Sequence, residues 1–152
     1  DYGPRYTAAD DFALIPMAEA HLSAGVGAFV LLEKIKEYYV FRKERLRRMA
    51  TSRNNLALMT IQGYTMEPTI HAWNVVLIDT DRKKIYDGNI HALGRLDETI
   101  VIKRLELLSG EPVRIFGDNI SPEYTPEIAH MGQIRVISRV IWLAKGLVKG
   151  EL

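Results

Sequence analysis

From residue 56 onward the chain alternates short apolar segments with polar or glycine-containing turns, and this pattern constrains the fold more than any other feature. The segments are rich in Val, Ile and Leu, and the turns include Asp87-Gly88 and Ser109-Gly110. The apolar segments are residues 56–61, 75–78, 90–93, 99–108, 113–116 and 134–143. We therefore predict a mainly β fold with curled antiparallel sheets and one or two short helices.

The chain before this region is less regular. Residues 1–11 are polar and predict a linker or arm, which leaves residues 12–152 as one domain. A chain of 152 residues suits a single compact domain with a sizeable core. Residues 12–17 predict a strand, and Pro16 would place that strand at a sheet edge because proline lacks the N–H that a ladder needs.

Two later stretches give different signals. Residues 33–39 fit either a helix or a strand, whereas residues 42–49 contain good helix formers with Leu46 and Met49 three positions apart. We predict a short helix for residues 42–49. Its basic residues are better explained as a solvated face than as a DNA-binding surface.

Composition excludes several classes of function. The 20 basic residues nearly balance the 19 acidic ones, whereas a domain that grips nucleic acid through phosphate contacts is normally far more basic. There is no cysteine, no apolar run of bilayer length and no leader-like N-terminus, so we expect a cytoplasmic protein without a membrane anchor. The four histidines have no metal-site spacing and no glycine-rich phosphate loop occurs, so we expect neither metal nor cofactor.

The segment that follows the apolar residues 56–61 contains a threonine hydroxyl, that of Thr65. Residues 63–70 read Gly-Tyr-Thr-Met-Glu-Pro-Thr-Ile, and Pro68 is favourable in the first turn of a helix, so a helical turn is predicted just after Thr65. The backbone N–H groups of such a turn could stabilise an oxyanion, or the Thr65 side chain could cap them as an ordinary N-cap. The local sequence alone favours the cap.

A lysine further along could activate that hydroxyl. Strand alternation places Val101, Lys103 and Leu105 on one face, and a lysine between apolar neighbours is a candidate for burial. Burial disfavours the ammonium and lowers the pKa, as a lysine general base requires. The alternative is a lysine whose stem packs while its amine reaches water.

The two segments together resemble the self-cleaving serine peptidase domain of LexA/CI-type repressors, peptidase family S24. That family's motif reads G-D-S-M-x-P-T-I with a later V-K-R-L, and Gly63, Met66 and Pro68 match it. The resemblance extends over residues 12–145 and implies a fold of the LexA/signal-peptidase type. Further matches occur, in order, at residues 41–48, 87–93, 118–119, Tyr124 and 137–142.

The resemblance implies a hydroxyl–lysine dyad that cuts its own chain. Thr65 would be the nucleophile, Lys103 the general base, and the bond between Ala24 and Gly25 the one cleaved. Three departures bear on activity: Thr65 replaces serine, Tyr64 replaces aspartate, and Trp73-Asn74 replaces Gly-Asp. The β-methyl of threonine restricts its rotamers and crowds the approach to the carbonyl, so weak or lost cleavage is expected.

The resemblance also implies partners. Such domains pair as homodimers, and the segment 134–143 with Trp142 is either an interface or core. DNA would be bound only by an N-terminal helix-turn-helix domain upstream of Asp1. The sequence begins without an initiator methionine, which fits this expectation. A recombinase filament or an antirepressor would act as the inducing partner of a prophage-type repressor. The alternative is a stand-alone, UmuD-like self-processing protein or a soluble Ser/Thr-Lys peptidase.

Overall fold

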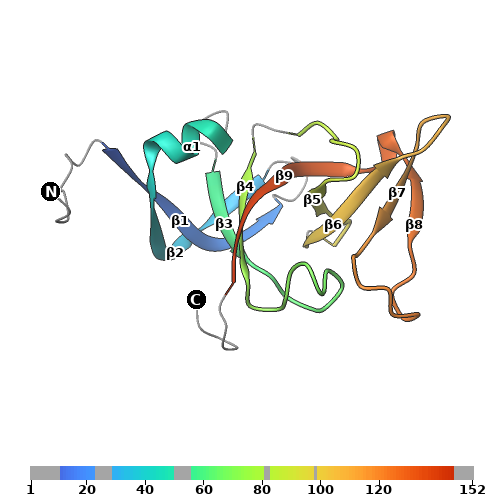
Figure 1. The fold of residues 1–152 in the computed structure, drawn as a ribbon, viewed down its shortest axis with the longest axis horizontal. Helices are drawn as coiled ribbons and strands as arrows, with labels where there is room; N and C mark the ends of the chain where they lie inside the picture. The colour runs from blue at the N-terminus through green and yellow to red at the C-terminus, as the bar shows by residue number, and fades with distance from the viewer. Residues whose placement is uncertain (1–10, 23–28, 50–55, 81–82, 98, 146–152) are drawn as a thin grey trace, which may run out of the picture.

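The computed structural model describes residues 11–22, 29–49, 56–80, 83–97 and 99–145, and within them it is a single nine-stranded sheet with one short α-helix (Figure 1). The elements, in chain order, are β1 (Phe12–Leu22), β2 (Phe29–Arg42), α1 (Lys43–Met49), β3 (Leu56–Thr60), β4 (Val75–Asp79), β5 (Ile90–Gly94), β6 (Ile100–Leu107), β7 (Pro112–Phe116), β8 (Glu127–His130), the 3-10 turn η2 (Met131–Gln133) and β9 (Arg135–Ala144). The strand order is β2-β1-β3-β4-β9-β5-β6-β7-β8. All pairings are antiparallel except β1 with β3. The mainly β prediction is therefore confirmed.

Strands β1 and β2 form a long hairpin whose ladder runs from Phe12 opposite Arg42 to Leu22 opposite Phe29. The ambiguous stretch 33–39 is thus a strand. The prediction that Pro16 places its strand at an edge is wrong, because β1 lies between β2 and β3. The pairing of β1 with β3 is confined to Met17 opposite Leu58, so no continuous ladder on that side needs the missing N–H of Pro16.

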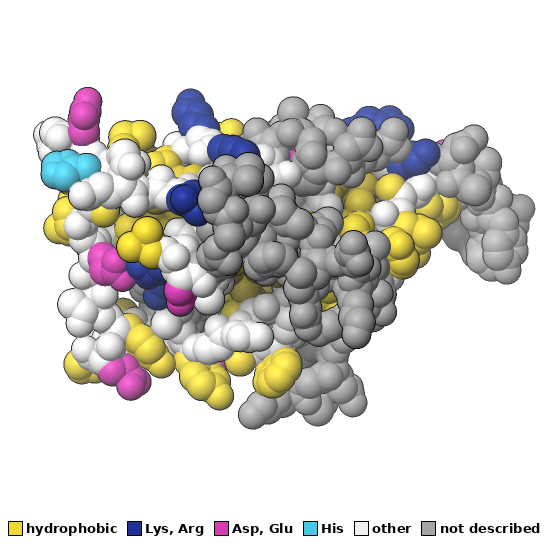
Figure 2. All heavy atoms as spheres, turned by 180° about the vertical axis from the view of Figure 1, so that it is seen from behind, with side chains coloured by type: hydrophobic (Ala, Val, Ile, Leu, Met, Phe, Trp, Pro, Cys, Tyr) yellow, Lys and Arg dark blue, Asp and Glu magenta, His cyan; other side chains and the backbone are white. Residues whose placement is uncertain are grey.

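The two faces of this hairpin differ. One face buries Ile15, Met17 and Phe41 in a core cluster with the start of β3 and with β4. The other face exposes Leu14 and Val40, which lie opposite each other, each with 62% of its surface accessible. Figure 2 shows hydrophobic side chains at the surface of this end of the molecule.

The helix α1 is anchored mainly by one fully buried side chain. Leu46 is 1% exposed and packs into the same cluster, with Met49 partly buried beside it. The arginines of the helix are exposed, and Arg48 pairs with Glu44 one turn away. The short helix and its solvated basic face therefore agree with the sequence.

Strand β9 is central rather than peripheral, since it pairs with both β4 and β5. Its side chains contribute to all three core clusters, and Trp142 meets Phe41 edge to face at a centroid distance of 4.9 Å. Packing within one chain thus buries part of Trp142.

Strands β5 to β8 curl around a third cluster, whose buried members are Leu93, Leu105, Val113 and Ile115. Arg95, just after β5, makes two hydrogen bonds of 3.3 and 3.1 Å to the carboxylate of Glu127 in β8. Because β5 and β8 are not neighbours in the sheet, this exposed pair links strands that the ladder does not join. Strand β8 was not predicted, since only Ala129 among its residues is even partly buried and no apolar alternation marks it.

Candidate active site

Thr65 lies in the loop of residues 61–74 that joins β3 to β4. The loop is closed at its base, where the N–H of Trp73 donates to the carbonyl of Ile61 and the N–H of Ile61 donates to that of Asn74. Met66 and Ile70 point into the first core cluster and are 2% and 1% exposed. The loop is therefore fixed both by its backbone and by two buried side chains.

The predicted helical turn after Thr65 is wrong. Residues 65–69 form turns, the Glu67–Pro68 peptide is cis, and the one bond of helical spacing runs from the N–H of Ile70 to the carbonyl of Met66. After that bond the chain turns back, and the N–H of Trp73 donates to the carbonyl of Ile61. The N-cap role is wrong with it, and among the described residues the Thr65 hydroxyl has no hydrogen-bond partner.

The segment after β7 holds the backbone of Thr65. The N–H of Asn119 donates to the carbonyl of Thr65 at 3.0 Å, and the Asn119 side-chain amide donates to the carbonyl of Tyr64 at 2.9 Å. Gly117 lies so close that an added Cβ would be 2.0 Å from the Thr65 carbonyl oxygen. Residues 118 and 119 were recognised in sequence only as family matches, and the contact of Gly117 had no sequence signal.

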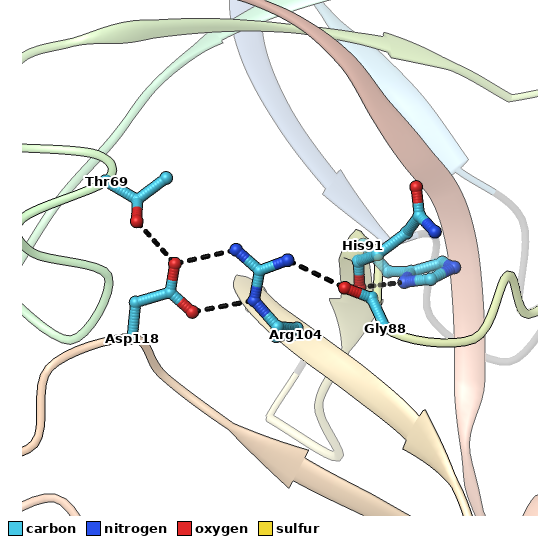
Figure 3. A network of polar contacts seen from close by, with 6 residues as sticks. Thr69, Gly88, His91, Arg104 and Asp118 are labelled. Carbon is cyan, nitrogen blue, oxygen red and sulfur yellow. Dashed lines mark hydrogen bonds and ion pairs between the residues drawn. The ribbon is translucent and has the colours of Figure 1, made fainter.

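Asp118 connects the loop of Thr65 to strand β6 (Figure 3). Its carboxylate accepts from the Thr69 hydroxyl and, at 2.7 Å each, from two nitrogens of the Arg104 guanidinium. A third nitrogen of Arg104 donates to the carbonyl of Gly88 at 2.7 Å. Thr69, Gly88, Arg104 and Asp118 are called the Asp118 network below. The bonds from Arg104 lower the pKa of Asp118, with a smaller contribution from Thr69, and the same contact raises the pKa of Arg104.

His91 holds the turn that carries Gly88, the carbonyl partner of Arg104. It is fully buried, its Nε2 accepts the N–H of Tyr86 at 3.0 Å, and its Nδ1 lies 2.9 Å from the carbonyl of Asn89. Accepting at Nε2 requires the neutral ring, with the proton on Nδ1. Burial lowers its pKa, nearby Arg139 lowers it further, and the bond to Asn89 opposes both. A neutral His91 thus fixes the turn that presents the Gly88 carbonyl to Arg104.

Lys103 lies on β6, on the face that the alternation predicts. Val101 and Leu105 on either side of it belong to the third cluster, whereas Ile100 and Ile102 belong to the first. Lys103 is half-buried, and its pKa is lowered by burial and by the positive charge of Arg95, against an opposing effect of Glu127. The lysine that sequence singled out therefore has a shifted protonation equilibrium in the direction a general base needs.

The loop of Thr65 and the strand of Lys103 are connected through β7 and the residues that follow it. Asn119 bonds the loop of Thr65, and the strand before it, β7, pairs with β6. Among the described residues no hydrogen bond joins the Thr65 hydroxyl to the Lys103 amine. Ala24 and Gly25 lie outside the described residues, between the end of β1 and the start of β2.

Other kinds of site find little support in the described part of the chain. Across the residues that the structure describes, no three His, Asp or Glu side chains group as a metal would require. None of the helices placed there is long and apolar enough to cross a membrane.

Comparison with known proteins identifies the class. The family model for Peptidase S24-like proteins matches residues 16–141, so the chain belongs to that family. It is similar to the repressor protein CI of Enterobacteria phage phi80, with 29% identity over 105 residues that are 67% of this chain and 43% of the repressor. It is also similar to the HTH-type transcriptional regulator PrtR of Pseudomonas aeruginosa, with 28% identity over 137 residues that are 88% of this chain and 53% of the regulator. The chain thus spans about half the length of the curated relatives it matches.

Proposed function

We propose that the chain is the C-terminal regulatory domain of a phage-type transcriptional repressor and that it cleaves itself slowly through Thr65 and Lys103. The observation that carries the proposal is the half-buried Lys103 with its lowered pKa, on a strand of a domain of the S24 family. The relatives are a repressor and a regulator rather than stand-alone peptidases, which favours this function over a self-processing protein of the UmuD kind.

The reaction would be an intramolecular acyl transfer. The Thr65 oxygen attacks the carbonyl carbon of Ala24 while its proton passes to the neutral amine of Lys103. The tetrahedral intermediate collapses, the C–N bond breaks, and Lys103 returns the proton to the amino group of Gly25. Water, deprotonated by the same lysine, then opens the ester on Thr65 and yields the Ala24 carboxylate.

The hairpin supports delivery of the cleaved bond. Strand β1 ends at Leu22, two residues before Ala24, and β1 approaches β6, the strand that carries Lys103. A substrate bond held in the same chain needs no diffusional encounter, and such proximity is worth on the order of 10⁵ M or more in effective concentration. The β-methyl of Thr65 limits how the oxygen can approach, which is why we expect the reaction to be slow.

We further propose that the domain acts as a homodimer and that DNA is bound by a helix-turn-helix domain outside this chain. Its own charge is nearly balanced, which argues against DNA binding by the domain itself. The inducing partner would be a recombinase filament or an antirepressor.

The test is to incubate the protein between pH 7 and 10 and to follow its mass. We expect slow appearance of two fragments divided between Ala24 and Gly25, faster at high pH, and abolished in Thr65→Ala and Lys103→Ala. Thr65→Ser removes only the methyl group and is expected to cleave faster. An intact chain in both the parent and Thr65→Ser after prolonged alkaline incubation would contradict the peptidase activity.

A further inference from the structure

The residues that would react come from different elements, and one short segment contacts both sides. Thr65 belongs to the loop between β3 and β4, whereas Lys103 belongs to β6. Residues 117–119, which follow β7, touch the loop and also bind β6. We call residues 117–119 the positioning segment.

The positioning segment fixes the backbone of the nucleophile at three points. Gly117 lies against the carbonyl of Thr65, and Asn119 donates one bond to that carbonyl and another to the carbonyl of Tyr64. Asn119 is itself held, because its side-chain oxygen accepts the N–H of Ser121 at 3.0 Å. The carbonyl groups of Tyr64 and Thr65 are therefore both oriented by residues distant in sequence.

Asp118 then fixes the same loop relative to β6. It binds Thr69, four residues after Thr65, and two nitrogens of the Arg104 guanidinium, Nε and Nη2. Arg104 is the residue next to Lys103 and points to the opposite face of the strand. A two-point arginine–carboxylate contact defines distance and orientation together, which one point charge does not. Moving Asp118 would shift the loop of Thr65 against the strand that carries Lys103.

We infer that Asp118 and Asn119 are positioning residues that set the distance between the Thr65 hydroxyl and the Lys103 amine. The inference rests on the proposed function for its chemistry, although the contacts themselves do not depend on it. Neither residue takes a proton or touches the cleaved bond. A displacement of about 1 Å at a reacting atom lowers rates on the order of 100-fold, so small changes in the segment are expected to have large effects.

The test uses Asp118→Asn, which keeps the shape but removes the charge and one acceptor of Arg104, and Asn119→Asp, which removes the donor to Tyr64. The matched control is Glu44→Gln, which breaks another arginine–carboxylate pair, on the helix α1. Cleavage is followed in the Thr65→Ser background, well below the unfolding temperature of every variant. We expect roughly a 10- to 100-fold slower reaction for the two segment variants and no change for the control.

The pH profile separates positioning from general-base catalysis. Arg95 and Glu127, and not Asp118, are the charged groups that shift the pKa of Lys103. The midpoint of the rate against pH is therefore expected to stay where it is while the plateau falls. Unchanged plateau rates, or a midpoint that moves together with the plateau, would overturn the inference.

A second measurement tests the positioning role even if no variant cleaves. The methyl resonance of Thr65 and the amide exchange of residues 61–74 report the position of the loop by NMR. We expect both to change in Asp118→Asn and Asn119→Asp and to stay as in the parent protein in Glu44→Gln. An absence of cleavage with changed NMR signals would refute the proposed peptidase activity alone, whereas unchanged signals in the segment variants would refute the positioning role.

Discussion

A methyl group added at Gly117 would lie 2.0 Å from the carbonyl oxygen of Thr65 and 2.9 Å from its carbonyl carbon. Both atoms are backbone, so no side chain can rotate away. We expect Gly117→Ala to destabilise the protein by about 1–3 kcal/mol, as overpacking does, and to disturb the Thr65 loop. Urea unfolding measures the change. The control is Gly132→Ala, where nothing lies within 4 Å of the added Cβ and the effect should stay within about 0.5 kcal/mol.

Lys103 links the site to the pH dependence of stability. Its pKa is lower in the folded protein, so between the folded and the ordinary lysine value the unfolded chain binds more protons. Stability from this group therefore rises with pH through that window and is lowest below it. We expect Lys103→Met to be more stable than the parent at neutral pH, with the difference shrinking as pH rises toward the ordinary lysine value. Unfolding free energies measured from pH 7 to 10 test this, and a constant difference would contradict it.

At the scale of elements, the short helix depends on one buried contact. Leu46 is 1% exposed in the second core cluster, whereas Arg47 beside it faces solvent. We expect Leu46→Ala to cost about 2–5 kcal/mol of unfolding free energy, because it leaves a cavity. Arg47→Ala should change it by no more than about 0.5 kcal/mol. Equal effects of the two changes in chemical denaturation would show that α1 does not dock as described.

Most strands were predictable because their residues are apolar in short runs that turns with positive φ at Gly88 and Gly110 separate. Strand β8 was not predictable, because an edge strand with three exposed residues carries no alternation. The internal place of β1 could not be predicted either. Its parallel pairing with β3 has one register position, Met17 opposite Leu58, and its packing joins residues far apart in the sequence, which no local pattern encodes.

The candidate site, too, could be predicted from the sequence only in part. The face of Lys103 follows from alternation along one strand, so sequence located it correctly. The contacts of Gly117, Arg104 and Asp118 join three segments of the chain, and only the folded sheet brings these segments together. The helical turn expected at Pro68 does not form, because the loop is closed by backbone bonds between Ile61 and residues 73–74, which no local preference encodes.

At the scale of the whole molecule, the internal position of β1 predicts that the two fragments of the proposed cleavage stay associated. A fragment ending at Ala24 would contain β1, which lies between β2 and β3 and buries Ile15 and Met17 at 2% and 8% exposure. We expect the two fragments to elute together in gel filtration without denaturant and to separate in urea. Cut protein that separates at once under native conditions would contradict this.

Breaking one peptide bond between β1 and β2 would therefore not by itself separate the two fragments of the chain. An internal strand would first have to leave the sheet, and two core side chains with it. If the chain is the repressor domain proposed above, the lifetime of those paired strands would determine how long a cut molecule stays in one piece.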